Sequence, residues 1–363
     1  MKFRAQQGIL AEALGALSRI ASTRNMGTPA LSGVKMNLTG DTLVVSSTDN
    51  DVSMQFVIAV GGDTDGQALV SARMLNDIVR VMPAGGQIVV EVAGDLAKVS
   101  AGRSEFTIPT LNAIEFPRVT PPSGDAITIE SAAFKQALGQ VVLAASKDPQ
   151  KHNLTAVLMT STPAGLRIVA TDGYRMAMRD LPGGAPESVD QFLIPSRALA
   201  ELQRLLDISD EVTVRFSETD AAFQTPSMTL TTRLINAQYP PYLGIIPKDS
   251  TNIAVVQREE ILDALRRTGV LASDVAPVRL RMSSEGARLS VTLPDGSTSV
   301  EDVDAQFTGD EITVAFNADY LASGVDACGT EEVAISTSQP NKPAIIRPVG
   351  DESYLYLLMP QRL

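Results

Sequence analysis

The stretch that decides the fold reads Gly8-Ile9-Leu10-Ala11-Glu12-Ala13-Leu14-Gly15-Ala16-Leu17 and runs on to Ala21-Ser22. Related stretches run from Ala132 to Ser146 and from Glu260 to Ser273, and each also ends in Ala-Ser. The Ala-Ser pairs recur at a spacing of about 125 residues, which exceeds the unit of a solenoid and is typical of whole domains. The sequence therefore predicts three related domains.

Each third of the chain shows the same predicted order of strands and helices. In the first third, a short strand at 2–4 leads into the repeated helix, and alternating strands follow at 33–38, 42–47 and 52–60. A further strand and helix, at 67–70 and 72–82, precede two closing strands. The other thirds show the same order, with a helix predicted at 197–206 and a long strand predicted at 299–307. We expect an α+β protein whose units each contain two helices and about eight strands, a doubled βαβββ motif.

Two segments rich in turn-forming residues separate the predicted units. Residues 117–124 read Pro-Arg-Val-Thr-Pro-Pro-Ser-Gly, and residues 247–251 read Pro-Lys-Asp-Ser-Thr. Such clusters are typical of linkers. We therefore expect domains at residues 1–123, 124–251 and 252–363.

The composition is ordinary for a soluble protein of several domains. The chain has 363 residues, 44% hydrophobic and 20% charged, and exceeds the size at which one core usually stops growing. The first residues lack the apolar core of a signal peptide, and no apolar run approaches the ~18 residues of a membrane helix. A single cysteine, Cys328, excludes an internal disulfide. We expect a cytoplasmic protein with no membrane partner.

The distribution of charge is more informative than its total. A net charge of −12 argues against coating nucleic acid by bulk attraction, but local fields can still steer a polyanion. Arg73 and Arg80 are two turns apart on one predicted helix face, and Arg197 and Arg204 repeat that spacing in the second unit. For Lys147 the helix dipole is an equally good reason for a cation. Arg73 and Arg197 open their helices, where the dipole disfavours a cation, so a shared basic surface explains them better.

Catalytic groupings are scarce. The only histidine, His152, lies in a predicted loop without a nucleophile signature, and a solvated loop histidine is the simpler interpretation. The sequence holds no phosphate-binding glycine loop and no Cys/His metal spacing. Residues 61–66 faintly resemble half of a calcium loop but lack its closing Glu, so we interpret them as a hairpin connection. We expect no catalysis, no metal and no cofactor.

Three segments carry a specific resemblance. They are Val-Ala-Thr-Asp-Gly-Tyr-Arg-Met-Ala at 169–177, Arg-Leu-Ile-Asn-Ala-Gln-Tyr-Pro-Pro-Tyr at 233–242, and the ending Leu-Met-Pro-Gln-Arg-Leu at 358–363. They closely resemble signatures of the bacterial replicative sliding clamp, the beta subunit of DNA polymerase III. The resemblance spans the chain and implies three clamp domains, with two copies closing head to tail into a six-domain ring whose helices line the pore. It implies a processivity factor that encircles duplex DNA without reading its sequence.

The resemblance also implies particular sites. Residues facing DNA, with Arg80 added from its helix face, would be Arg24, Arg73, Arg80, Lys147, Lys151, His152, Arg197 and Arg204. A cleft for a short peptide of the polymerase, clamp loader and repair proteins would contain Leu154, Thr171, Gly173, Tyr174, Arg175, Met176, Pro240, Ile245, Met359, Pro360, Gln361, Arg362 and Leu363. Gly244 and Gln361 depart from the usual residue types of the family, which bears on peptide preference.

For the contact between two copies we expect two patches of apolar residues and charges of opposite sign. An edge strand of the first unit offers Arg103, Phe106 and Ile108; the third unit offers Val270, Leu271, Glu301, Asp302 and Asp304. Two alternatives stay open. One is a specialised clamp paralogue, such as a duplicate conferring drug tolerance. The other is a β-rich multidomain ligand-binding protein or hydrolase, which the lack of acid/base pairs disfavours.

Overall fold

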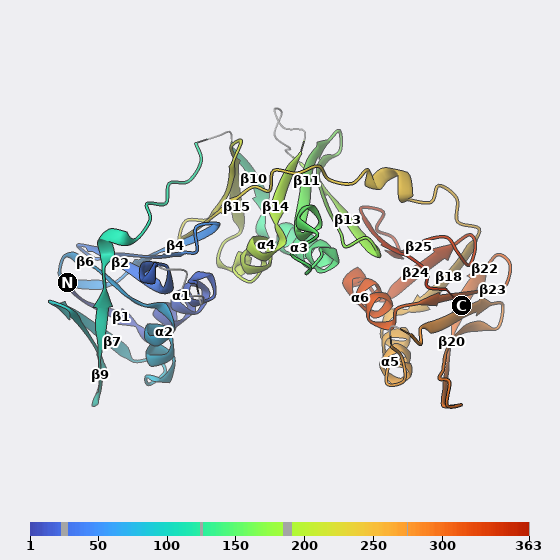
Figure 1. Ribbon diagram of the computed structural model, residues 1–363, viewed down its shortest axis with the longest axis horizontal. Helices are drawn as coiled ribbons and strands as arrows, with labels where there is room; N and C mark the ends of the chain where they lie inside the picture. The colour runs from blue at the N-terminus through green and yellow to red at the C-terminus, as the bar shows by residue number, and fades with distance from the viewer. Residues whose placement is uncertain (23–27, 124–125, 184–190, 274, 363) are drawn as a thin grey trace. The chain divides into compact units, whose positions relative to one another are not determined.

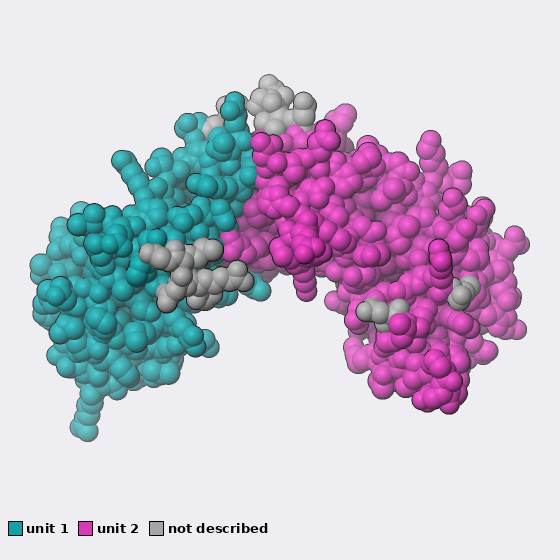
Figure 2. Space-filling model, viewed as in Figure 1, with its two compact units in different colours: residues 1–132, 204–234 teal, residues 133–203, 235–363 magenta. Residues whose placement is uncertain are grey.

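The structure, a computed structural model, describes residues 1–22, 28–123, 126–183, 191–273 and 275–362 (Figure 1). The chain forms two compact units (Figure 2). Unit 1 comprises Met1–Ala132 and Arg204–Leu234, and unit 2 comprises Ala133–Gln203 and Ile235–Leu363. The middle third of the chain therefore contributes to both units.

Unit 1 is built on one long antiparallel sheet with two helices. Its helical elements are α1 (Gln7–Ile20), η1 (Pro29–Ser32), α2 (Ala72–Val81), η2 (Ala113–Glu115) and η5 (Leu206–Ile208). Its strands are β1 (Lys2–Gln6), β2 (Gly33–Thr39), β3 (Thr42–Thr48), β4 (Val52–Ala59), β5 (Gly61–Thr64), β6 (Gly66–Ser71), β7 (Gln87–Ala93), β8 (Leu96–Ala101), β9 (Ser104–Leu111), β10 (Ala126–Glu130), β15 (Glu211–Phe216), β16 (Asp220–Gln224) and β17 (Met228–Arg233).

Strand alternation and helix periodicity explain how unit 1 is assembled. The thirteen-stranded sheet has the order β10-β15-β16-β17-β4-β3-β2-β6-β9-β8-β7-β1-β5. Helix α1 buries Leu10, Ala13, Leu14 and Leu17, one stripe at helical spacing, and packs against β3 and β4. On β3, Leu43 and Val45 are buried, while Val44 between them points to the opposite face. One face of this part of the sheet therefore packs into the core against α1, and the opposite face does not belong to that core.

Unit 2 contains a nine-stranded and a four-stranded sheet. Its helical elements are α3 (Ser131–Val141), whose first two residues belong to unit 1, η3 (Val142–Ala144), η4 (His152–Thr155), α4 (Ser196–Gln203), η6 (Tyr242–Ile245), α5 (Arg258–Thr268) and α6 (Ala318–Cys328). Its strands are β11 (Ala156–Thr162), β12 (Gly165–Thr171), β13 (Arg175–Pro182), β14 (Phe192–Pro195), β18 (Asn252–Gln257), β19 (Val278–Ser283), β20 (Gly286–Thr292), β21 (Thr298–Val303), β22 (Ala305–Thr308), β23 (Ile312–Phe316), β24 (Glu332–Thr337), β25 (Ala344–Pro348) and β26 (Tyr354–Leu358).

In unit 2, the sequence of helix α6 explains where the helix begins and ends and how it packs. The Asn317 side chain caps the helix by accepting a hydrogen bond from the Tyr320 amide at 3.0 Å, and Gly329 ends it at a left-handed φ of 68°. Within the helix, a Cβ on Gly324 would lie 2.4 Å from the Tyr356 ring. The absent side chain lets α6 approach β26 closely, so Tyr356 is fully buried between them. Cys328, near the end of the same helix, is 1% exposed and belongs to the core of unit 2.

The sheets are assembled from repeated groups of four strands. The nine-stranded sheet has the order β14-β11-β12-β13-β26-β25-β24-β18-β22, and the smaller one has β21-β20-β19-β23. In the middle third, β-α-β-β-β is followed by a second β-α-β-β-β, and the first and last thirds show the same order with one added strand each, β5 and β22. β5 pairs with β1 and lies in the stretch 61–66 that was expected to be only a hairpin connection. The doubled βαβββ motif and the α+β class are confirmed. Neighbouring thirds join by antiparallel pairing of β17 with β4 and of β13 with β26.

Some sequence-based expectations need correction. The strand predicted at 299–307 is two strands, because β21 pairs with β20 whereas β22 pairs with β18. The helix predicted at 197–206 ends at Gln203 and is followed by the short η5. Arg103 lies in the turn between β8 and β9 and not on a strand. Residues 117–123 and 247–251 carry no helix or strand, as expected of linkers, while the boundaries 1–123, 124–251 and 252–363 stay predictions.

None of the helices in the described ranges combines the length and hydropathy that a bilayer crossing requires. Those same ranges contain no group of three or more His, Cys, Asp or Glu side chains placed to hold a metal ion.

Candidate partner-binding site and basic surface

The turn between β12 and β13 is held by side chains of its own sequence. The Thr171 hydroxyl donates to the Arg175 carbonyl at 2.7 Å and accepts from the Gly173 amide at 3.1 Å. Asp172 Oδ1 accepts from the amides of Tyr174 and Arg175 at 2.9 and 3.0 Å. Gly173 adopts a left-handed φ of 94°, which a side chain would disfavour. The turn is therefore rigid before any partner binds.

The first third of the chain contains the same turn. Thr48 and Asp49 make the hydrogen bonds of Thr171 and Asp172, with Asn50 at a φ of 80° in the place of Gly173. Thr171 and Gly173 are thus parts of a repeated scaffold and not special to a binding site. The second turn differs in what it displays, because Tyr174 and Arg175 stand where the first has Asp51 and Val52.

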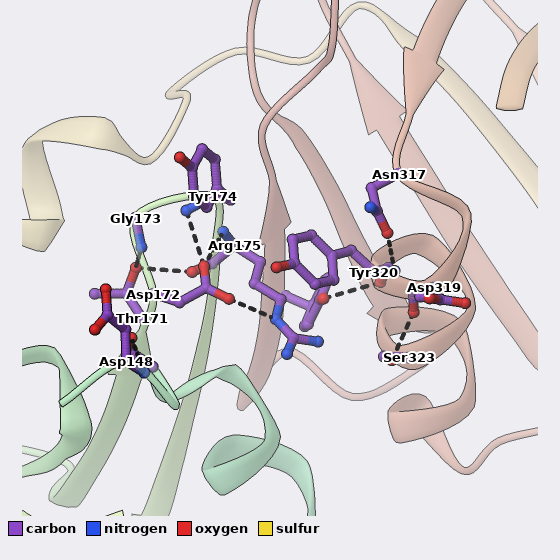
Figure 3. Close-up of polar contacts among 12 residues, drawn as sticks. Asp148, Thr171, Asp172, Gly173, Tyr174, Arg175, Asn317, Asp319, Tyr320 and Ser323 are labelled. Carbon is purple, nitrogen blue, oxygen red and sulfur yellow. Dashed lines mark hydrogen bonds and ion pairs between the residues drawn. The ribbon is translucent and has the colours of Figure 1, made fainter. Parts of the chain in front are cut away.

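Arg175 links this turn to helix α6 (Figure 3). Its Nε donates to Asp172 Oδ2 at 3.0 Å, and its guanidinium carbon lies 4.2 Å from the centroid of the Tyr320 ring. Burial opposes the charge, but Tyr356 and Asp172 outweigh it, so the pKa of Arg175 is raised. The Tyr356 hydroxyl in turn donates to the Tyr320 carbonyl at 2.9 Å. Arg175 is therefore a fixed cation between two elements far apart in sequence.

An apolar cluster lies behind the turn. Its buried members come from six strands and from η6: Ala156, Leu158, Val169, Met176, Leu193, Tyr242, Ile345, Leu355 and Leu357. Tyr239 packs against them and donates from its hydroxyl to the Val169 carbonyl at 3.4 Å. Met176 is fully buried, so it supports this surface from below and is not a lining residue.

Large apolar side chains remain exposed near the cluster. Tyr174 is 59% exposed, Leu243 60%, Ile245 47% and Met359 38%. Leu154 and Pro240 are half-buried. Adaptable apolar side chains around a fixed cation suit a short peptide, whose backbone carbonyls the cation can orient. Gly244 has open space around it, so no steric need explains the missing side chain at this position.

The C-terminal residues are tied to both sides of this surface. The Met359 amide donates to the Tyr174 carbonyl at 2.9 Å, and the Gln361 amide donates to the Ala315 carbonyl at 2.8 Å. Gln361 Oε1 is buried and has no hydrogen-bond partner within the described ranges. Pro360 is half-buried and Arg362 is exposed, whereas Leu363 lies outside the described residues.

Sequence reasoning missed the residues that fix Arg175. Tyr320 and Tyr356 carry no local signal, because their partner lies more than a hundred residues away. Asp172 could have been found, since the Thr-Asp pair recurs at 48–49.

Replacement of Asp172 by Ala should destabilise unit 2. Asp172 is 8% exposed and accepts two backbone hydrogen bonds besides holding Arg175, so we expect a loss of about 2 kcal/mol in the free energy of unfolding. Asp49→Ala, which removes the equivalent turn hydrogen bonds, is the matched control and should cost less because Val52 needs no carboxylate. Calorimetric unfolding compares the two variants, and an unchanged unfolding temperature for Asp172→Ala would contradict the assigned role.

The predicted basic residues fall into separate groups. In unit 1, Arg73 and Arg80 are exposed on α2, and Arg73 Nε lies 3.9 Å from Asp77. In unit 2, Lys147 and Arg197 line a groove of about 610 Å³ that Arg175 also reaches. Both Arg197 and His152 are exposed. Arg204, which directly follows α4 and belongs to unit 1, is exposed as well. Arg24 lies outside the described residues.

Lys151 has a different environment from the one expected of a residue that faces DNA. Its Nζ donates to the Asp172 carbonyl at 3.4 Å and lies 5.1 Å from the centroid of the Tyr174 ring. It therefore braces the peptide-binding turn, and only part of its side chain is exposed.

The two patches expected to join copies of the chain differ in detail from the prediction. Phe106 is 40% exposed on β9, but Ile108 is 6% exposed and belongs to the core of unit 1. Val270 is 81% exposed after α5, and Leu271 is half-buried. The acids already have cations: Glu301 accepts from Arg267 at 2.7 Å, and Asp302 holds Arg288 through two bonds of 2.6 and 3.0 Å. These hydrogen bonds lower the pKa of both carboxyl groups. Asp304 is exposed.

Solved structures with the same architecture define the class of protein. The clamp of Bartonella birtlesii bound to griselimycin superposes with a TM-score of 0.93 at 27% identity and covers 100% of both chains. The beta subunit from Pseudomonas aeruginosa gives 0.89 at 27% identity, again over 100% of both chains. The repeated doubled motif is therefore that of a three-domain DNA clamp.

Comparison of sequences gives the particular family. Models of the N-terminal, central and C-terminal domains of the DNA polymerase III beta subunit match residues 1–120, 128–241 and 244–362. The beta sliding clamps of Streptomyces coelicolor and Synechococcus elongatus are each 31% identical, over 100% of both sequences. The chain belongs to the DNA polymerase III beta subunit family. Its function is that of a sliding clamp, a processivity subunit without catalysis of its own.

Proposed function

We propose that two copies of the chain close head to tail into a ring of six domains that encloses duplex DNA. The observation that carries this proposal is a repeated rule of strand pairing. The last strand of the middle third, β17, pairs with β4 of the first third, and the last strand of the final third, β26, pairs with β13 of the middle third. β4 and β13 each end the first βαβββ half of their own third. Two strands at equivalent positions have no such partner. β9, the last strand of the first third, pairs with β6 only through Leu111 and Thr110. β21, which ends the first half of the final third, is an outer strand of its sheet. One of these edges belongs to the first third of the chain and the other to the last third.

Closure by the same pairing would also satisfy the exposed strand edges. An unpaired edge offers amides and carbonyls that bind water or another strand. Both existing junctions are antiparallel, and a head-to-tail contact between β9 of one copy and β21 of another repeats them. Because each copy has one edge of each kind, two copies can satisfy both edges of each other and close into a ring.

The basic residues would then hold DNA loosely. Phosphate contacts from Arg24, Arg73, Arg80, Lys147, His152, Arg197 and Arg204 would read no sequence, so the ring would be free to slide. The net charge of −12 keeps the remaining surface from binding nucleic acid nonspecifically. We place this activity in the cytoplasm, where a bacterial chromosome is copied.

The apolar cluster and the turn at Tyr174 would receive the partners. A short peptide of the replicative polymerase, the clamp loader or a repair protein would lay apolar side chains against Tyr174, Ile245 and Met359 while Arg175 orients its backbone. Griselimycin, which is bound to the Bartonella relative, is a suitable competitor for this surface.

Retention on DNA tests the proposal. In the variant Arg73→Ala, Arg197→Ala, Arg204→Ala, we expect faster release from nicked circular DNA while the dimer persists. Removal of one cation from a phosphate should reduce the slope of log affinity against log salt by about 0.9. The measurement is retention on nicked circular and linear DNA after loading by the cognate clamp loader, at several salt concentrations.

A charge-matched control separates the basic surface from net charge. The variant Arg4→Ala, Arg279→Ala, Lys342→Ala removes three cations outside the proposed surface and should be retained like the wild type. If wild-type protein left circular and linear DNA at the same rate, the enclosing ring itself would be refuted.

A further inference from the structure

A polar groove lies in unit 1 beneath residues 116–121, where the first third of the chain passes into the second. It has a volume of about 280 Å³ and is floored by β2, β3, β4 and β17. Ser46, whose neighbour Val45 is buried toward α1, faces this groove on the other side of the sheet. The groove is therefore separate from the helices and from every surface described above.

The groove occupies in the first repeat the place that the apolar cluster occupies in the second. The cross-strand pairs that correspond are Lys35–Ser46, Ser46–Gln55 and Ser53–Thr231 in the groove, and Leu158–Val169, Val169–Met178 and Met176–Leu357 in the cluster. Each floor is also crossed by the segment that links two thirds. The backbone is the same, but side chains able to form hydrogen bonds replace apolar ones.

The groove carries positive charge without compensation. Lys35 and Arg118 line it, and no Asp or Glu is among its lining residues. Within the described ranges neither cation forms an ion pair; the Lys35 ammonium lies 5.7 Å from the centroid of Phe116. Phe116 is buried with Ala30 and Leu69, which anchors one end of the covering segment. An anionic group between the two cations would gain from both.

A buried hydroxyl in the floor lacks a partner. Thr231 is 8% exposed, and its Oγ1 is buried without a hydrogen bond to any described residue. A polar atom left unsatisfied in this way costs free energy that a bound ligand can recover. Its neighbour Ser53 is already satisfied by the Thr48 hydroxyl at 2.7 Å. Thr231 thus provides an unused hydrogen-bonding group on the floor of a basic groove.

We propose that this groove is a second peptide-binding site, which takes a short acidic and hydroxyl-rich segment of a partner protein. An acidic side chain would lie between Lys35 and Arg118, and a polar group of the segment would reach Thr231. The strand face and the covering segment favour an extended chain, as at the equivalent apolar surface. An apolar peptide is rejected, because it would leave the hydroxyl and amide groups of the floor desolvated without partners. The two repeats would therefore select opposite peptide chemistries.

Titration calorimetry with the acetylated, amidated pentapeptide SESDS tests the proposal on the full chain. We expect saturable binding of one peptide per chain and none of the neutral analogue SQSNS. The variant Lys35→Ala, Arg118→Ala should weaken binding about tenfold, since each partly exposed cation contributes roughly threefold. Thr231→Val preserves shape and removes one hydrogen bond, so it should weaken binding about fivefold.

The controls separate this site from general electrostatics and from folding. Arg279→Ala, Lys342→Ala removes the same charge elsewhere and should leave binding of SESDS unchanged. Absence of binding to the wild type at millimolar peptide, or equal binding by the Lys35→Ala, Arg118→Ala variant, would overturn the proposal. Citrate or inorganic phosphate binding as tightly as the peptide would overturn it as well, because the groove would then take a free anion. Thr231→Val keeps the test valid if the double variant fails to fold.

Discussion

The substitution Phe106→Asp should convert the clamp from a dimer into monomers at micromolar concentration. Phe106 pairs with Val99, seven residues before it, just as Leu230 pairs with Phe223 in the equivalent hairpin. Leu230 is fully buried at the β17–β4 junction, opposite Met54, whereas Phe106 is 40% exposed on the unpaired edge. A second copy is the element that would bury Phe106 in the same way.

The size of this effect follows from the two junctions that a closed dimer contains. Each would lose about 1 kcal/mol of apolar burial and incur a penalty of several kcal/mol from an unpaired carboxylate at the interface. We expect the dissociation constant to rise by at least about 100-fold. Sedimentation over a range of concentrations measures it.

Two further variants complete this test. Phe106→Leu preserves the apolar side chain and should remain dimeric. Ile114→Asp places the same charge at a residue that is 93% exposed in η2 and should not affect assembly. A dimer of Phe106→Asp at nanomolar concentration would mean that β9 is not the joining edge.

The second large effect concerns the peptide cleft. Deletion of residues 359–363 should weaken binding of the clamp-binding peptide of the cognate polymerase by roughly 100-fold. Met359 is among the exposed apolar side chains there, and loss of its burial in a complex, together with the displaced chain end, amounts to about 3 kcal/mol. Titration calorimetry, with griselimycin as competitor, gives the dissociation constant.

The deletion also removes two backbone hydrogen bonds, to Tyr174 and Ala315, so a milder variant is needed. Met359→Ser with Tyr174→Ala keeps the backbone and should still weaken the peptide at least tenfold. Val349→Ser, at a residue that is 44% exposed elsewhere in unit 2, is the matched control. Wild-type affinity in both cleft variants would show that the peptide binds elsewhere.

The candidate surfaces differed in how far the sequence could predict them. The turn at Thr171–Arg175 was recognisable because its hydrogen bonds join residues within five positions of each other. The contact between the Arg175 guanidinium and the Tyr320 ring was not recognisable, since no periodic pattern connects residue 175 with residue 320. For Ile108, a strand position was correct, but burial depends on what packs against the strand, and this side chain is part of the core.

The sequence by itself determined the three repeats, nearly every helix and strand, and the basic residues that open α2 and α4. These features arise from local periodicity, capping and turn chemistry, all of which act over a few residues. The tertiary structure alone decided which strands join neighbouring thirds and which edges stay open. It also decided that the sheet face at the β17–β4 junction carries a polar groove, whereas the one at the β13–β26 junction carries an apolar cluster. Pairs such as Met54 with Leu230 and Ala177 with Tyr356 are separated by well over a hundred residues. Their selection depends on the packing of whole sheets, which no local stretch of sequence encodes.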